Sequence, residues 1–187
     1  MNRMLRGACA AGLLVLGGTG PALAGPAEDT APGPWSLTAG GAVIAPEGGR
    51  EGYGVYLNLG WRMPYHSPGA PRSFFALELE LMETTDSYRR SHGGGRIEGD
   101  LRSAGFYLAA NTAMGERSFF RARLGGVYRY LDESHRRARH QGRIGVGLGL
   151  GYNLTERLDL VTDAGLQYLG LSTRFTYVGT AGLRVRF

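Results

Sequence analysis

The sequence has 187 residues and a formal net charge of +5, and all 21 of its basic residues are arginine. This length favours a single domain. A sequence pI near 9.7 can indicate nucleic-acid binding, but the arginines are scattered singly through patterned segments rather than gathered in one basic patch. We therefore expect no nucleic-acid partner.

The first 24 residues are predicted to form a cleaved signal peptide. Arg3 and Arg6 give a positive start, the stretch from Ala8 to Leu16 is apolar, and Ala22-Leu23-Ala24 is a small-x-small cleavage signal. The apolar stretch is too short for a membrane anchor. The chain is therefore expected to be exported.

The region after the predicted cleavage site divides into two parts. Residues 25–34 are rich in proline, alanine and glycine and are expected to form a flexible lead-in. Residues 35–187 form the predicted domain. Cleavage would remove Cys9, the only cysteine, and with it any disulfide, thiolate nucleophile or cysteine metal ligand.

From Trp35 onward apolar residues recur with a period of two, which is the spacing of β-strands. The pattern predicts eight strands, at residues 35–44, 52–62, 73–84, 101–113, 118–131, 142–153, 157–169 and 174–187. Each has about the 9–11 residues that a tilted strand needs to cross a bilayer. No run of 18 apolar residues follows residue 24, so a membrane-spanning helix is not expected.

Aromatic residues and connection lengths both favour a membrane barrel over a soluble sandwich. The aromatics gather near strand ends, where membrane barrels carry their girdles: Trp35, Trp61, Tyr128, Tyr130, Tyr152, Tyr168 and Phe187. Connections at one end are the tight turns 115–117 and 154–156 and a longer proline-rich loop at 63–72. Those at the other end are 45–51, 85–100, 132–141 and 170–173, and we assign this end to the extracellular side.

The last strand, Tyr177-Val-Gly-Thr-Ala-Gly-Leu-Arg-Val-Arg-Phe187, alternates and ends on an aromatic residue. With the signal peptide and eight strands in series, the sequence resembles the small outer-membrane barrels typified by the OmpA transmembrane domain and the OmpX/Ail-like proteins, over essentially all of residues 35–187. The resemblance implies an all-β, eight-stranded antiparallel up-and-down transmembrane barrel in the bacterial outer membrane. It also implies that Phe187 is read by the barrel-assembly machinery, and we expect a monomer.

Charged residues also fall on the inward face of the predicted strands. An eight-stranded barrel is only wide enough to be filled by its side chains, so these charges must pair. We predict a connected salt-bridge network of Glu78, Glu80, Arg121, Arg123, Asp159, Asp163, Arg184 and Arg186. Antiparallel pairing places Asp159 opposite Arg184. This network favours a closed lumen over a conducting pore.

The long loops offer a possible binding surface. Arginine forks suit phosphate groups, so Arg89, Arg90, Arg136, Arg137 and Arg139 are candidate contacts to lipopolysaccharide, with a merely solvated loop as the alternative. Catalysis is not expected, because the adjacent Ser91-His92 and Ser134-His135 pairs do not provide the geometry of a triad. No cofactor or metal is expected, since His135 and His140 lack a third ligand.

These features predict a non-enzymatic outer-membrane barrel with a plugged polar interior. Its role is structural or surface-interacting, through lipopolysaccharide or an external partner, and outer-membrane lipid surrounds it. Two alternatives remain open: an enzyme that modifies outer-leaflet lipid, and a narrow pore.

Overall fold

A computed structural model describes residues 33–46, 49–67, 70–92, 95–133, 138–168 and 175–187. For residues 65–67, 70–72, 88–92, 95–97 and 133 it describes the backbone alone. The predicted signal peptide at residues 1–24 and most of the lead-in at 25–34 lie outside the described residues.

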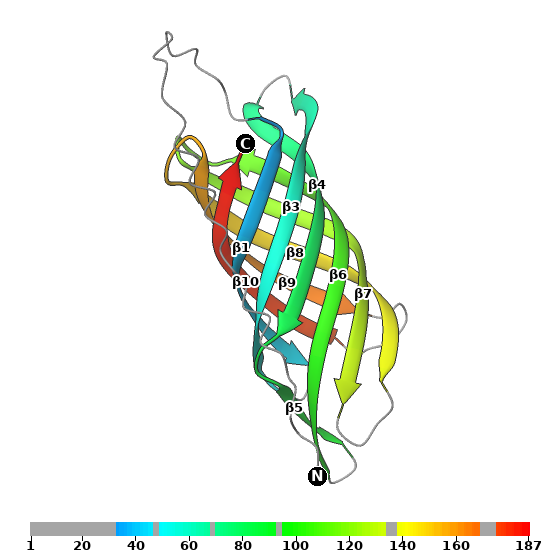
Figure 1. The fold of residues 1–187 in the computed structure, drawn as a ribbon. Coiled ribbons are helices and arrows are strands. Elements are labelled where there is room, and N and C mark those ends of the chain that lie inside the picture. Colours follow the sequence, from blue (N-terminus) through cyan, green and yellow to red (C-terminus); the bar gives the residue numbers. More distant parts are fainter. Residues whose placement is uncertain (1–32, 47–48, 68–69, 93–94, 134–137, 169–174) are drawn as a thin grey trace, which may run out of the picture. The chain divides into compact units, whose positions relative to one another are not determined.

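Eight long strands form a closed antiparallel barrel, which confirms the predicted fold class (Figure 1). They are β1 (Trp35–Pro46), β3 (Gly52–Ser67), β4 (Ala70–Thr84), β6 (Gly95–Ala113), β7 (Ser118–Glu133), β8 (Arg139–Asn153), β9 (Leu158–Tyr168) and β10 (Phe175–Arg186). Each strand pairs with its neighbour along the chain, and β10 pairs with β1 to close the ring. Closure leaves the barrel wall without an edge strand.

The register places the two ends of the barrel domain together. Ser36 at the start of β1 lies opposite Arg186 at the end of β10, and Trp35 lies opposite Trp61 of β3. Phe187 also exchanges two backbone hydrogen bonds with Trp35, at 3.0 and 3.2 Å. The other end of the barrel carries the connections that the sequence assigns to the extracellular side.

Three connections contain more strand than the sequence indicates. The expected proline-rich loop at 63–72 is wrong: β3 continues to Ser67 and β4 begins at Ala70, with register shifts on either side of His66. Irregular pairing of this kind lets a proline lie in a hairpin, because it lacks the N–H of a regular ladder.

At the opposite end, the predicted loops 45–51 and 85–100 contain β2 (Gly49–Arg50) and β5 (Tyr88–His92). The β5 strand pairs with the beginning of β6, and β2 pairs with β5. The sheet therefore continues beyond the barrel wall at this end, where Figure 1 shows β5 projecting from it.

The two faces of the wall differ sharply in character. Leucine, valine and aromatic side chains point outward and are exposed, whereas charged and polar side chains point inward and are buried. This is the reverse of a soluble protein, and it follows from the period-two alternation of the sequence. Within the described part of the chain, no helix has the length and apolar character to cross a membrane.

One group of buried side chains is apolar. It consists of residues near the loop ends of the strands: Ala42, Ile44, Tyr56, Met82, Leu101, Leu131 and Val178. We call this group the apolar cap. It occupies the end of the lumen that lies toward β2 and β5.

Candidate functional site: the charged interior

The candidate site is the group of charged side chains inside the barrel. Strand alternation places Glu78 and Glu80 on the inward face of β4, and Arg121 and Arg123 on the inward face of β7, because residues two apart share a face. Asp159 and Asp163 come from β9 and Arg184 and Arg186 from β10. The first seven are buried, and Arg186 is partly exposed.

The middle of the lumen holds one cluster of ion pairs. Arg121 forms an ion pair with Glu78, and Arg123 Nη1 lies 2.5 Å from Glu80 Oε2. Asp163 lies between the two arginines, with Oδ1 3.2 Å from Arg121 Nε and Oδ2 4.0 Å from Arg123 Nη1. These five residues form the central cluster, in which β4, β7 and β9 are joined across the lumen.

A second cluster lies nearer the chain termini. Arg184 Nε donates to Asp159 Oδ2 at 2.8 Å, and Arg186 Nη2 donates to Asp159 Oδ1 at 2.9 Å. Asp159 lies directly opposite Arg184 in the β9–β10 register. We call these three residues the terminal cluster.

The eight residues thus divide between two clusters, where the sequence predicts one connected network. The ring of Phe119 explains the separation, because the Arg184 guanidinium stacks over it, 4.9 Å from the ring centroid. An aromatic face partly satisfies a cation without a carboxylate. Arg123 makes the same kind of contact with Tyr107, at 4.5 Å.

Glycines on β8 make the space for these side chains. A Cβ atom on Gly151 would lie 1.8 Å from Phe119 Cζ, and one on Gly149 would lie 2.3 Å from Asp163 Oδ1. A Cβ on Gly147 would meet Arg123 at 3.2 Å. From Gly145 to Gly151 the inward face of β8 is therefore bare backbone, against which the bulky groups of β7 and β9 pack.

Several buried polar and aromatic residues of the lumen are absent from the sequence-based list. Asn58 Nδ2 donates to Glu78 at 3.2 Å, and Arg129 Nη1 donates to the Thr176 hydroxyl at 3.1 Å. Tyr107 and Phe119 supply the aromatic faces. Inward parity was the available signal for all of them, joined by charge for Arg129. The others are uncharged, and uncharged polar and aromatic residues also occur on outward faces, so parity alone does not single them out.

The apolar cap was likewise missed, because its members look like ordinary strand residues in the sequence. Ile44 and Leu101 are almost completely buried. They lie on the inward face at the strand ends, where the lumen nears the loops. The lumen thus contains two kinds of side chain: ion-paired charged groups in its middle and apolar groups toward the loops.

The predicted surface contacts are only partly described. Arg139 is exposed at the start of β8. Arg89 and Arg90 are described by their backbone alone, and Arg136 and Arg137 lie outside the described residues. Arg50 joins this region, because β2 pairs it opposite Arg89.

The histidine and serine residues considered for catalysis or metal binding do not form one described site. Ser91 and His92 are described only by their backbone in β5, and Ser134 and His135 lie outside the described residues. His140 is on the outer wall of β8, with Nδ1 2.8 Å from the Tyr128 hydroxyl. Among the residues with described side chains, no group of three histidine, cysteine, aspartate or glutamate residues could hold a metal ion.

Comparisons with known proteins agree on the fold. The chain is similar to Ail, the attachment invasion locus protein of Yersinia pestis, crystallised with the heparin analogue sucrose octasulfate (17% identity, TM-score 0.53, 82% of this chain and 97% of that one). It is similar to Neisserial surface protein A (18%, 0.57, 82% and 97%). It is also similar to the outer-membrane protein OprG of Pseudomonas aeruginosa (12%, 0.61, 83% and 97%).

No protein-family model matches the chain, and no curated protein matches it in sequence. At these identities the likeness concerns the architecture of the barrel rather than any individual residue. The chain has the fold of the small eight-stranded outer-membrane barrels.

Proposed function

We propose that the protein is a non-enzymatic barrel of the bacterial outer membrane, with a closed interior and a structural or surface-interacting role. The observation that carries this proposal is the inversion of the barrel: its outward side chains are apolar and its buried interior is charged. Exposing this apolar outer surface to water would be unfavourable, whereas the hydrocarbon core of a bilayer can accommodate it.

The exposed apolar surface is far larger than a soluble monomer tolerates. A typical soluble monomer exposes one contiguous apolar patch of about 300–600 Å² at most. Here at least one outward leucine is exposed on each of the eight long strands, and exposed valine, isoleucine or aromatic side chains accompany it on all of them except β9. A continuous belt of this kind is the lipid-facing surface of a membrane barrel.

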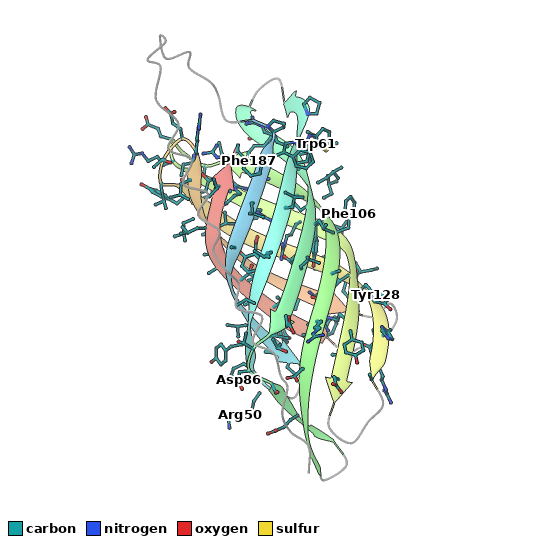
Figure 2. All side chains as sticks on the ribbon, viewed as in Figure 1. Arg50, Trp61, Asp86, Phe106, Tyr128 and Phe187 are labelled. Atoms are coloured by element: carbon teal, nitrogen blue, oxygen red, sulfur yellow. The ribbon has the colours of Figure 1, made fainter. Side chains whose placement is uncertain are left out.

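Aromatic residues lie toward both ends of this belt. Figure 2 shows Trp61 and Phe187 near one end and Tyr128 nearer the other, all on the outside of the barrel. Tryptophan and tyrosine favour the boundary between hydrocarbon and headgroups, where one part of the ring is apolar and another is wet. Their positions support a spanning orientation along the strands.

The proposed surface interaction uses the loop end. Arg89, Arg90, Arg136, Arg137 and Arg139 are the proposed contacts to lipopolysaccharide phosphates, since guanidinium groups bind oxyanions in a bidentate manner. Ail, which shares the fold, was crystallised with a sulfated heparin analogue. That complex supports oxyanion recognition by a barrel of this architecture.

Two further features belong to the proposal. Export through the signal peptide at residues 1–24 would deliver the chain to the periplasm, and Phe187 would serve as the signal for the barrel-assembly machinery. We propose that the folded protein is a monomer.

The two alternatives find less support in the geometry. A lipid-modifying enzyme needs a nucleophile, a base and an orienting acid within reach of one another, and His140 contacts Tyr128 and Tyr130 instead. A pore would have to pass both the central cluster and the apolar cap. A hydrophobic constriction of this kind resists the entry of water and ions.

Membrane fractionation tests the proposal. We expect the protein in the outer-membrane fraction, and we expect unheated and boiled samples to migrate differently in detergent gels, because a closed barrel resists unfolding. Recovery as a soluble periplasmic protein would contradict the proposal. Hydrolysis of labelled lipopolysaccharide by the purified barrel would favour the enzyme.

The loop contacts have their own test. Changing the five arginines together to glutamine should reduce the lipopolysaccharide that co-purifies, while the heat-dependent gel shift is retained. A matched control changes Arg117 and Arg157, which are exposed at the opposite end of the barrel. If equal amounts of lipopolysaccharide co-purify with the two variants, the loop arginines are merely solvated and do not bind it.

A further inference from the structure

The outer wall carries a groove in the middle of the apolar belt. It has a volume of about 650 Å³ and crosses β6, β7, β8 and β9. Its floor is formed where small side chains replace the leucines of the neighbouring rows, at Ala110, Ala122 and Ala164. Leu108, Leu124 and Leu166 form one wall.

The register brings these alanines into one row, in which the exposed Leu148 stands between Ala122 and Ala164. Ala110 lies opposite Ala122, Ala122 opposite Leu148, and Leu148 opposite Ala164. Beneath them the inward residues Gly147 and Gly165 also lie opposite one another, so the wall is close to bare backbone there. The groove opens outward, among side chains that the proposed function places in hydrocarbon.

A polar cluster lies on the same strands, closer to the loops. The His140 ring stacks against Tyr128, with centroids 5.7 Å apart, and meets Tyr130 at 5.1 Å. His140 Nδ1 is 2.8 Å from the Tyr128 hydroxyl. When that hydroxyl donates to Nδ1, the imidazole hydrogen is on Nε2, which can donate it to an oxyanion.

Just below the polar cluster, two outward positions carry no side chain. A Cβ atom on Gly126 of β7 or on Gly142 of β8 would meet nothing within 4 Å. Both glycines face outward. Gly126 is two residues before Tyr128 on β7, and Gly142 lies opposite Tyr128 in the register. Phe106 and Ile144 lie on either side of Gly126 in the register, and Leu124 stands between Gly126 and Ala122 on β7. An extended molecule over Gly126 would therefore pass between Phe106 and Ile144 and then cross the leucine row to enter the groove.

The spacing of the two features matches one leaflet of a bilayer. Tyr130 and Ala122 are eight residues apart on β7, which corresponds to about 27 Å along a strand. A strand tilted by about 45° in a membrane covers roughly 19 Å of depth over that length, against about 15 Å for half the hydrocarbon core. With the histidine at headgroup level, the groove lies near the bilayer centre.

From these observations we propose that the outer face of β6–β9 is a binding site for a single membrane lipid with a phosphorylated headgroup. One acyl chain lies in the groove floored by Ala110, Ala122 and Ala164. The headgroup phosphate accepts a hydrogen bond from His140 Nε2 beside the two tyrosines. This inference rests on the proposed membrane location, and it adds a site that is independent of the loop arginines.

Native mass spectrometry of the detergent-solubilised barrel tests the site. The probes are dipalmitoyl phosphatidic acid, which has a phosphate headgroup, and dipalmitoylglycerol, which has the same chains without it. The wild-type protein should retain one phosphatidic acid molecule per barrel. Ala122→Phe should lower its retention about tenfold by filling the groove.

The control is Ala39→Phe, which adds the same side chain at an exposed alanine on β1, away from the groove. It should retain lipid as the wild type does, and Ala164→Phe should repeat the loss seen with Ala122→Phe. His140→Phe keeps the ring but removes the donor, so it should abolish the preference for phosphatidic acid over dipalmitoylglycerol.

Equal retention of phosphatidic acid by Ala122→Phe and Ala39→Phe would rule out the groove as the acyl-chain site. An unchanged preference of His140→Phe for phosphatidic acid over dipalmitoylglycerol would rule out the headgroup contact. A dimer that Ala122→Phe dissociates would instead assign the groove to a second copy of the chain. Each sample is first checked for the heat-dependent gel shift. Loss of that shift in the wild type would count against the membrane barrel itself, whereas loss of lipid alone counts against this site.

Discussion

Two ion pairs of equal length lie on opposite sides of the barrel wall. Arg184 and Asp159 meet at 2.8 Å inside the lumen, with side chains 5% and 0% exposed. Arg102 and Glu83 also meet at 2.8 Å, but on the outer face near the loops, with side chains 68% and 52% exposed. The two pairs therefore differ in burial and not in distance. Solvent screens the charges of the outer pair and can hydrate either charge if its partner is removed, whereas a buried charge left without its partner is costly.

The same contrast holds for the wall as a whole. Inside, a buried charge is costly unless a neighbour of opposite charge matches it, because it has been removed from water. Outside, a side chain has lipid or solvent next to it and can change with less consequence. Four predictions measure this contrast.

The largest effect is expected at the terminal cluster. Asp159→Ala leaves Arg184 and Arg186 without their shared carboxylate, and breaking a buried pair in this way costs about 3–5 kcal/mol. The free energy of unfolding, measured by denaturant titration in detergent, should fall by that amount. Replacing Asp159 and Arg184 together by leucine and methionine should recover much of the loss, with Arg186 free to turn toward solvent.

The apolar cap should be nearly as sensitive. Leu101→Ala removes buried methyl groups and leaves a cavity, which in protein cores costs about 2–5 kcal/mol. The same titration measures it. A loss well below this range would mean that the cap can collapse around the space, or that lipid or water already enters it.

Glycine substitutions compare the two faces of the wall directly. A Cβ on Gly151 would overlap the Phe119 ring, so Gly151→Ala should lower the free energy of unfolding by about 1–3 kcal/mol. Gly41 faces outward with nothing within 4 Å of its added Cβ, so Gly41→Ala should change stability by less than about 0.5 kcal/mol. Equal changes in the free energy of unfolding of the two variants would contradict the inference that the inward glycines of β8 make room for the side chains packed against them.

The smallest effect is expected for the outer pair. Arg102→Gln breaks the contact with Glu83, and exposed pairs are worth at most about 1 kcal/mol. Its denaturation midpoint should stay close to that of the wild type. A loss as large as that of Asp159→Ala would show that the loop end is far less solvated than its exposure indicates.

Much of the fold could be predicted from the sequence because the alternation is long and regular. The period of two assigns each side chain to one face, so the outward leucines of β8 and the inward carboxylates of β9 follow directly from their parity. The pairing of Asp159 with Arg184 also follows, because a short connection between β9 and β10 fixes the register.

The remainder depends on contacts between distant strands. The division into two clusters is set by the Phe119 ring, whose neighbour Arg184 is far away in the sequence. The apolar cap consists of seven residues from six strands, and none of them is unusual in its own strand. The extension of β3 to Ser67 and the start of β4 at Ala70 were hidden by the prolines of this segment, which normally indicate a loop.

We infer that the central cluster and the apolar cap together close the lumen. Ion flux through the protein reconstituted in lipid vesicles tests it most directly, with the heat-dependent gel shift verifying that the barrel is folded. We predict that folded wild-type protein adds no flux to that of empty vesicles, even under an applied potential. Sustained flux that rises in proportion to the folded protein would contradict the claim and make the barrel a pore.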